Sequence, residues 1–408
     1  MQLHLGVLAV LALALSTTPL GAQTSKPKSA APEPQHPKDL KPVPAAEIPA
    51  AIQRGRQILL ALQESLDDKP VKSEWPYEGV YRVEREIPLG YRIGGTAICA
   101  TALLETTSGE LDAETQAAVE RALAFVLESL PDPLMSTDFE KGYDVRGWGH
   151  AYALSFLLEA RGVPAFKGQK DKLDDQIRKL IGILEKTQIK KDGGWNYSRP
   201  KGDDSSASPF MTAPTLQFLF EAQTQGFKVD GTVIEAGLKT LEDARLESGA
   251  FQYSTNPERK NGKGFEDIPG STGRSPVCET TLFLAGRGSV ERIQKSLDDF
   301  LEHWRWLEQR RRQNGTHVPP YMIAPYYFFY AHRYAAQAIE FLPEDKRAGY
   351  RTKLYELLWH VREESGGWND RVFPRSENFG TAMTMMALHE PQAARPSGWK
   401  SPNVKKAK

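Results

Sequence analysis

The sequence Gly-Gly-Trp-Asn at residues 193–196 returns at residues 366–369, and a related stretch, Gly-Ala-Phe-Gln, stands at residues 249–252. Each of these loops follows an apolar helical stretch and precedes a second one that is rich in small residues. Six such pairs can be traced, and their second members begin about 50 to 65 residues apart. Self-similarity of this kind predicts a repeat architecture, in which each helical hairpin buries its apolar face against its neighbours.

The two helix types predict two concentric layers. First helices carry charges along one face, such as Asp174 and Lys179, which is typical of an outer layer. Second helices are nearly uncharged, as in Ala-Met-Thr-Met-Met-Ala at residues 382–387, and a helix that is apolar on all sides is buried on all sides. We therefore expect an all-α toroid, (α/α)6, over residues 48–390. A curved solenoid is the competing architecture, but it needs a polar concave face.

The predicted hairpins have long internal links and mostly short links to the next hairpin. The long loops and the N-termini of all inner helices should therefore share one face, where loop length and helix dipoles favour a binding site. Trp195 and Trp368 are expected to fill the gap between the layers. The predicted helix pairs are 49–63 with 93–105, 112–130 with 148–160, 173–187 with 211–223, 231–246 with 276–285, 290–311 with 325–341 and 345–362 with 378–388.

The two ends of the chain read as segments outside the toroid. Residues 1–22 resemble a signal peptide, because the apolar run 5–15 is too short to span a bilayer and small residues follow it. Residues 23–47 are rich in Pro and Lys and predict a disordered linker, and residues 391–408 predict a disordered basic tail. We expect an exported protein, periplasmic or extracellular, without stable membrane insertion.

Charge and cysteine content narrow the class of protein further. The 52 basic and 52 acidic residues balance, so no positive excess is available to hold a nucleic acid backbone. The two cysteines, Cys99 and Cys278, fall on opposite inner helices of the expected ring. A disulfide needs Cα atoms within about 7 Å, so two buried free thiols are expected. Nothing in the sequence identifies a protein partner.

Two segments resemble a known superfamily. Leu-Glu-Lys-Thr-Gln at residues 184–188, followed by Gly-Gly-Trp at 193–195, resembles the Gln–Trp repeat of squalene and oxidosqualene cyclases. Glu-Asn-Phe-Gly-Thr-Ala at residues 377–382 resembles the start of an inner helix in that superfamily. The chain is thus similar to the α/α-toroid group of terpenoid cyclases, protein prenyltransferase β subunits and complement-type thioester domains. The resemblance implies a toroid with a hydrophobic ligand.

The catalytic motifs of these families are missing. None of the four Asp-Asp pairs completes the Asp-x-Asp-Asp motif of class II cyclases, although Asp203-Asp204 lies on a long loop of the expected site face. Cys278 and His332 are weak candidates for a prenyltransferase-type zinc site, but the zinc triad is not found. No cofactor is therefore predicted, and zinc is not expected. Neither cysteine belongs to a thioester Cys-Gly-Glu-Gln run.

Candidate site residues gather at the predicted N-termini of inner helices. The candidate acids are Asp144, Glu279 and Glu377. Glu279 is favoured because a carboxylate on a buried helix is costly unless it is ion-paired or takes part in a functional site. Arg274 or a tyrosine hydroxyl is its expected partner. The candidate ligand-binding residues are Tyr143, Arg146, His150, Tyr152, Arg274, Tyr326, Tyr327, His332 and Asn378.

Three functions stay open on the sequence. The first is an exported repeat protein that binds a hydrophobic or glycan ligand in a central cavity, with or without catalysis. The second is a terpenoid cyclase or prenyltransferase, which the resemblance implies. The third is a carbohydrate hydrolase or lyase on an (α/α)6 barrel, since two carboxylates at one cavity can serve as acid and base.

Overall fold

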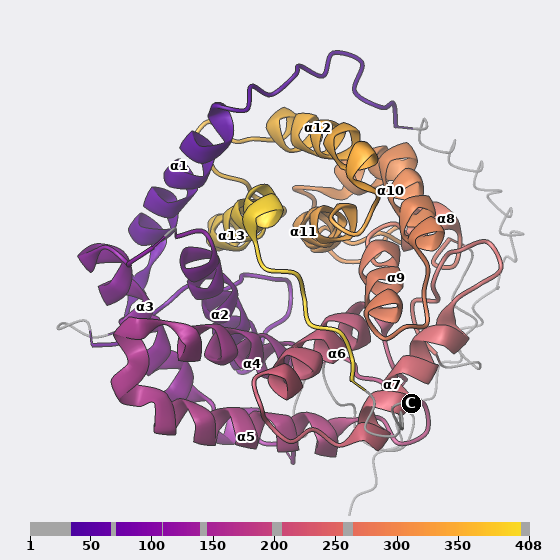
Figure 1. The fold of residues 1–408 in the computed structure, drawn as a ribbon. Coiled ribbons are helices and arrows are strands. Elements are labelled where there is room, and N and C mark those ends of the chain that lie inside the picture. The colour runs from indigo at the N-terminus through magenta and orange to yellow at the C-terminus, as the bar shows by residue number, and fades with distance from the viewer. Residues whose placement is uncertain are drawn as a thin grey trace, which may run out of the picture. The chain divides into compact units, whose positions relative to one another are not determined.

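The computed structural model describes residues 34–66, 71–107, 109–138, 145–197, 206–255 and 264–400. Within residues 35–400 the helices form two concentric rings (Figure 1). The outer ring contains α1 (Glu47–Leu62), α3 (Ala113–Ser129), α5 (Lys170–Thr187), α7 (Gly231–Ala244), α10 (Val290–Arg310) and α12 (Glu344–His360). The inner ring contains α2 (Leu89–Glu105), α4 (Arg146–Gly162), α6 (Pro209–Thr224), α9 (Ser275–Leu284), α11 (Tyr327–Ile339) and α13 (Glu377–His389).

The inner ring is closed. Each inner helix contacts the next one along the chain, and α13 packs against α2, so the last hairpin meets the first. The predicted all-α toroid is therefore confirmed, and an open solenoid is excluded. Smaller elements in the described ranges are the short helix α8 (Ile268–Ser271) and a two-stranded antiparallel ribbon of β1 (Glu64–Ser65) and β2 (Ser73–Glu74). Four 3-10 helices join them, η1 (Pro133–Met135), η2 (Pro164–Gln169), η3 (Pro374–Ser376) and η4 (Glu390–Gln392).

Three tryptophans join the two rings in the same way. Each indole N–H donates to a backbone carbonyl near the end of an outer helix, and each tryptophan backbone N–H donates to a threonine hydroxyl on an inner helix. The predicted gap-filling role of Trp195 and Trp368 is confirmed, and Trp75 repeats it. The three sets are Trp75 with Leu59 (2.6 Å) and Thr96 (2.9 Å), Trp195 with Leu184 (2.8 Å) and Thr212 (3.0 Å), and Trp368 with Leu358 (2.8 Å) and Thr381 (3.1 Å).

Glycines before two of these tryptophans are required by backbone geometry. Gly193 has a φ of +86° and Gly366 a φ of +88°, a left-handed conformation that side chains with a Cβ rarely adopt. At Gly367 a Cβ would lie 2.8 Å from the Thr381 hydroxyl oxygen. The Gly-Gly-Trp repeat therefore encodes a tight loop that brings the tryptophan between the two layers.

Residues 391–400 do not form the disordered tail that the sequence predicts. They cross the end of the inner ring at which the inner helices finish, and we call them the C-terminal strap (Figure 1). Trp399 anchors the strap: its backbone N–H donates to the Leu284 carbonyl at 3.0 Å, its indole N–H donates to Glu235 at 2.9 Å, and its ring stacks on Phe220. Polar residues of the segment add to this anchor, since Arg395 donates to Glu340 at 3.2 Å and the Ser397 hydroxyl donates to Glu221 at 2.6 Å. The predicted signal peptide and residues 401–408 lie outside the described ranges.

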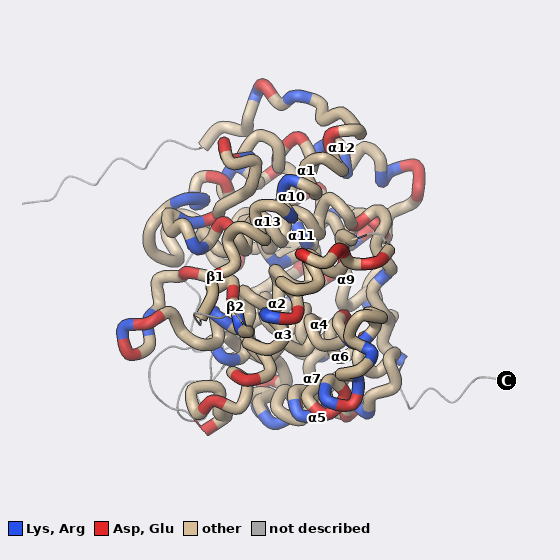
Figure 2. Tube along the Cα trace, turned by 90° about the vertical axis from the view of Figure 1, so that its left-hand side faces the viewer, with Lys and Arg blue, Asp and Glu red and all other residues tan. Residues whose placement is uncertain are grey.

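Other sequence expectations concern thiols, charges and membranes. Cys99 and Cys278 are free and buried, as predicted. Charged residues of both signs are interspersed over the outer helices and loops (Figure 2). In the described part of the chain, no helix combines the length and the apolar character that crossing a bilayer requires.

Candidate functional site

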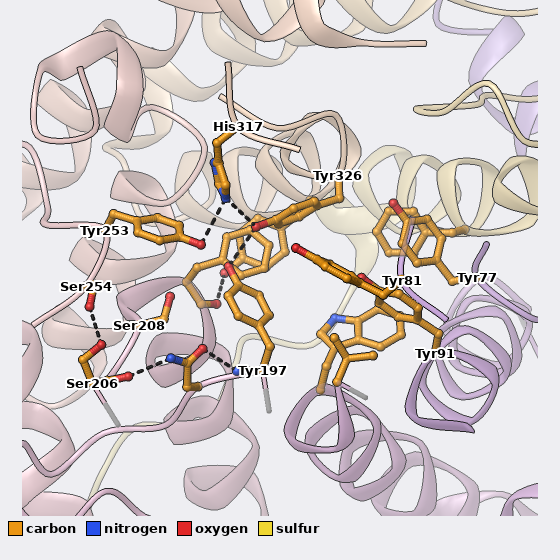
Figure 3. A pocket seen from close by; sticks show the side chains of 16 residues that line it. Tyr77, Tyr81, Tyr91, Tyr197, Ser206, Ser208, Tyr253, Ser254, His317 and Tyr326 are labelled. Atoms are coloured by element: carbon orange, nitrogen blue, oxygen red, sulfur yellow. Dashed lines mark hydrogen bonds between the residues drawn. The ribbon is translucent and has the colours of Figure 1, made fainter. Parts of the chain in front are cut away.

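A cavity of about 380 Å³ lies at the end of the inner ring where the inner helices begin. Its wall is mainly aromatic, with hydroxyl groups at one side (Figure 3). We call it the aromatic cavity. Its lining residues are Tyr77, Tyr81, Tyr91, Val145, Trp148, Asn196, Tyr197, Ser206, Ser208, Phe210, Tyr253, Ser254, His317, Tyr326, Tyr330 and Phe379.

Hairpin order explains why these residues meet. Trp148, Phe210 and Phe379 belong to the first turns of three inner helices, and parallel inner helices begin at one end of the ring. Tyr253 and His317 come from long loops between an outer helix and the next inner helix, and those loops end at the same face. Local sequence therefore sets each side chain on its loop or helix, and ring closure brings them together.

His317 is the only histidine that lines the aromatic cavity in the described structure. Its Nδ1 lies 2.7 Å from the Met322 carbonyl oxygen, which can only accept, so Nδ1 carries the proton and Nε2 is an acceptor. Nε2 lies 3.0 Å from the Tyr253 hydroxyl and 3.3 Å from the Tyr326 hydroxyl (Figure 3). Burial lowers the pKa of His317 to about 4, so its imidazole is neutral at pH 7 and can accept a proton or a hydrogen bond.

Small polar groups form the opposite wall. The Ser206 and Ser254 hydroxyls are hydrogen-bonded to each other, and the Asn196 amide donates to the Ser206 carbonyl at 2.7 Å. Ser208 is 2 % exposed, and its hydroxyl oxygen has no hydrogen-bond partner among the described residues. The cavity thus offers flat apolar rings beside hydroxyl and amide groups, the combination that binds a sugar through its apolar face and its hydroxyls.

A buried charged pair lies behind the aromatic wall. The Tyr77 hydroxyl donates to Asp370 at 3.1 Å and accepts from the Arg371 Nε–H at 3.0 Å. Burial raises the pKa of Asp370 to about 7, although the Arg371 charge acts in the opposite direction. Asp370 does not line the cavity, so any effect on a ligand passes through Tyr77.

The predicted acids do not meet in this cavity as far as the structure describes them. Glu279 is 2 % exposed and pairs with Arg245 just after the outer helix α7, at 2.5 Å. The expectation of Arg274 or a tyrosine as its partner is therefore wrong, because this position of α9 faces the outer ring. Glu377 accepts from the Ser365 hydroxyl at 2.5 Å and does not line the cavity. Asp144 lies outside the described residues.

Most predicted ligand-binding residues have structural partners instead. Tyr326 lines the aromatic cavity, and Tyr327 packs behind it with ring centroids 4.8 Å apart. All of the hydrogen bonds of the Arg274 guanidinium go to backbone carbonyls, including those of Phe251 and Gly270, so this arginine fixes the loop before α9. Asn378 donates to the Pro76 carbonyl at 3.0 Å.

Three further candidates lie on α4, the inner helix of the second hairpin. Arg146 donates to the Ser136 carbonyl, and burial lowers the pKa of the neighbouring His150 to about 4. Tyr152 lies further along α4, where its hydroxyl is 3.3 Å from that of Tyr334. None of these three side chains lines the aromatic cavity. Tyr143 and the Asp203-Asp204 pair lie outside the described residues.

The weak zinc candidates are not close partners. His332 is fully buried, with its Nε2 accepting from the Trp304 indole at 2.8 Å and its Nδ1 donating to the Phe328 carbonyl at 2.7 Å. Both ring nitrogens are thus occupied. The Cys278 thiol contacts the Pro209 carbonyl at 3.7 Å. Within the described ranges no group of three or more His, Cys, Asp or Glu side chains is arranged to hold a metal ion.

Sequence reasoning missed most of the cavity. It concentrated on charged residues near inner-helix starts, whereas the wall uses loop aromatics. The available signal was the density of aromatic residues in loops that lead to inner helices, which are among the longest in the chain. The missed residues with that signal are Tyr77, Tyr81, Tyr197, Tyr253 and His317.

Comparisons with known proteins find similarity in the fold only. No family model and no curated protein matches the sequence. An α-1,6-mannanase from Salegentibacter, solved with α-1,6-mannotriose, is similar in structure with a TM-score of 0.53 and 10% identity, over 84% of this chain and 99% of that one. A β-1,3-1,4-glucanase from Paenibacillus gives a TM-score of 0.54 and 12% identity, over 91% and 96%. A D-mannose isomerase gives a TM-score of 0.51 and 14% identity, over 87% of this chain and 99% of that one.

These similarities concern the fold, because the identities are low. They support the toroid that the sequence predicts, but they give no support to the terpenoid cyclase or prenyltransferase assignment. The neighbours named here are two glycoside hydrolases and a sugar isomerase. The chain has a closed (α/α) barrel similar to theirs.

Proposed function

We propose that this protein binds a carbohydrate in the aromatic cavity and processes it there. The observation that carries the proposal is the composition of the wall, in which aromatic rings such as Trp148 and Tyr326 stand beside the hydroxyl and amide groups of Ser206, Ser208 and Asn196. Sugar rings stack their C–H faces on aromatic rings and direct hydroxyls to polar groups. A volume of about 380 Å³ suits a short oligosaccharide segment.

The similar structures support this proposal because the names of those proteins refer to carbohydrates. One of them was solved with α-1,6-mannotriose, and the other two are a glucanase and a mannose isomerase. The signal peptide predicted over residues 1–22 would deliver the protein to the periplasm or the cell exterior, where polymeric glycans occur. These observations favour the carbohydrate alternative over a hydrophobic ligand.

His317 favours isomerisation as a second candidate reaction. Aldose–ketose isomerisation moves a proton between neighbouring sugar carbons and needs one well-placed base, whereas glycoside hydrolysis uses two carboxylates. His317 presents a neutral Nε2 at the cavity, and no carboxylate lines the cavity among the described residues. The Tyr253 hydroxyl, at 3.0 Å, can donate to this nitrogen and relay a proton to a sugar hydroxyl, whereas the Tyr326 hydroxyl donates to that of Tyr197 at 3.4 Å.

Calorimetric titration tests binding. We expect mannotriose or a mixed-linkage glucotriose to bind saturably. Tyr326→Phe should weaken binding about 2- to 10-fold, the loss of one hydrogen bond of roughly 0.5–1.5 kcal/mol. Tyr327→Phe is the matched control, because Tyr327 is buried behind the cavity and does not line it. Absence of saturable binding by the unmodified protein to any of a panel of neutral and acidic oligosaccharides would contradict the proposal.

Product analysis distinguishes the two reactions. Hydrolysis shortens the oligosaccharide, whereas isomerisation converts mannose to fructose. If His317 is the base, His317→Ala should abolish isomerisation and leave binding within a few-fold of the unmodified protein. Hydrolysis that persists in this variant would exclude His317 as the essential group.

A further inference from the structure

A second cavity, of about 340 Å³, lies at the opposite end of the inner ring, under the C-terminal strap. We call it the acidic cavity, because four glutamates line it. Glu105 is the last residue of α2, Glu159 and Glu221 lie in the last turns of α4 and α6, and Glu390 directly follows α13. The two cavities are thus at opposite ends of the same set of parallel helices.

The helix ends make this position unfavourable for carboxylates. The C-terminus of an α-helix carries a partial negative charge, so an acidic side chain in the last turn is destabilised. Three neighbouring inner helices each present a glutamate there, and the partial charges of the helix ends add to the negative potential of the cavity. Such an arrangement favours a bound positive charge.

The chain's own cations compensate only part of this charge. Arg333 pairs with Glu390 and, at 3.5 Å, with Glu105. Arg395 of the strap also lines the cavity, but its guanidinium pairs with Glu340 at 3.2 Å. Arg333 is therefore the lining arginine that forms ion pairs with two of the four glutamates.

One exposed carboxylate and one buried amide oxygen in this cavity have no partner among the described residues. Glu159 has no hydrogen bond or ion pair with any described residue, and its side chain is accessible. Gln337 is only 5 % exposed, yet its Oε1 has no hydrogen-bond partner in the described part of the chain. Surrounding protein atoms, together with the charges of Glu105 and Glu221, raise the pKa of Glu159 to about 7. A buried amide oxygen without a donor is costly, and a ligand that donates hydrogen bonds would satisfy it.

The rest of the wall indicates an organic cation rather than a metal ion. No group of three or more His, Cys, Asp or Glu side chains in the described ranges is arranged to hold a metal. Leu158 and Phe218 add apolar surface, and the strap roofs the cavity and limits the size of a ligand. We propose that the acidic cavity binds a small aliphatic amine or diamine, whose ammonium group donates to the Glu159 carboxylate and to Gln337 Oε1. This site is separate from the proposed carbohydrate site and does not depend on it.

Calorimetric titration of the full chain with putrescine (1,4-diaminobutane) tests this proposal. The titration is run at pH 8, where a carboxyl with a pKa of about 7 is mostly ionised and an alkylammonium with a pKa near 10 stays charged. We expect saturable binding, which Glu159→Gln weakens at least tenfold. 1,4-Butanediol, of similar shape but without charge, should give no saturable binding.

Two controls keep the result interpretable. Glu128→Gln removes a carboxylate from the last turn of the outer helix α3, away from the cavity, and should leave putrescine affinity unchanged. Glu159→Gln should melt at the same or a higher temperature than the unmodified protein without ligand, because it relieves like-charge repulsion. No saturable putrescine binding, equal affinity in Glu159→Gln, or equal binding of butanediol would each overturn the proposal.

Discussion

At the scale of single residues, hydroxyl groups with similar burial have opposite roles in this protein. Thr96 is fully buried and accepts the backbone N–H of Trp75 at 2.9 Å. Thr280 is also fully buried, but its hydroxyl oxygen has no partner among the described residues. A buried polar group stabilises a fold only when it is hydrogen-bonded, so the partner rather than the residue type decides its value.

This contrast gives a prediction for a pair of isosteric substitutions. Thr96→Val should lower the free energy of unfolding by about 1–3 kcal/mol, because it leaves the buried Trp75 N–H without an acceptor. Thr280→Val should be neutral or stabilising, since it removes a hydroxyl that lacks a partner. Urea titrations of both variants measure the difference. Equal destabilisation by the two changes would show that the tryptophan–threonine bond does not join the rings.

At the scale of elements, the C-terminal strap is held by Trp399 and by polar contacts of Arg395, Ser397 and the Lys400 backbone. Trp399 supplies the stacking on Phe220 and two of the hydrogen bonds that fix it. We expect Trp399→Ala to release the strap while the two rings stay folded. Hydrogen–deuterium exchange of peptides from residues 391–400 should then become much faster, with unchanged exchange in α2 and α4. Lys400→Ala is the control, because the Lys400 side chain is exposed. Unchanged protection in Trp399→Ala would mean that other contacts hold the strap.

The acidic ends of the inner helices predict a pH dependence of stability. Surrounding protein atoms first, and neighbouring carboxylates in addition, raise the pKa of Glu159 and of Glu390 to about 7, above the value of about 4.3 in an unfolded chain. Between these values the folded protein binds more protons than the unfolded chain, so this contribution to stability falls as pH rises. Glu159→Gln should therefore raise the melting temperature of the protein, and this increase should be larger at pH 8 than at pH 5. Glu128→Gln should show a smaller change, and no gain for Glu159→Gln at pH 8 would contradict the charge repulsion.

At the scale of the whole molecule, closure of the ring couples all six hairpins. Because α13 packs against α2, no inner helix is a free end from which unfolding could begin. An open repeat array, in contrast, can lose its terminal units one at a time. We therefore expect a single cooperative unfolding transition for the toroid, with tryptophan fluorescence and far-ultraviolet circular dichroism reporting the same midpoint.

A substitution in the last hairpin tests this coupling. A Cβ at Gly380 would lie 2.3 Å from the Trp368 carbonyl oxygen, so Gly380→Ala must displace the backbone of α13. It should lower the urea midpoint while the two probes still coincide. Gly182→Ala on the outer helix α5 is the control: nothing lies within 4 Å of its Cβ, and removal of a helical glycine should stabilise by about 0.5–1 kcal/mol. Separate transitions for the two probes in Gly380→Ala would show that the hairpins unfold independently.

The amino-acid sequence by itself determined the architecture of this protein. Helix periodicity, the contrast between charged and uncharged helices and the Gly-Gly-Trp loops act over a few turns of chain, so local patterns predict the hairpins and their layers. The same patterns predicted the free thiols at Cys99 and Cys278 and the gap-filling Trp195 and Trp368.

Only the tertiary structure decided which side chains share a cavity. Glu279 and His332 have the right residue types and lie on inner helices, but rotation of α9 and α11 turns them toward partners in or next to the outer ring. Successive residues of an α-helix lie about 100° apart around its axis, so the rotation of the helix decides which side chains face a cavity. Sequence periodicity does not fix this rotation in a helix that is apolar on all sides. His317 and Tyr253 are 64 residues apart and meet because their loops belong to neighbouring hairpins, whose inner helices α9 and α11 pack against each other.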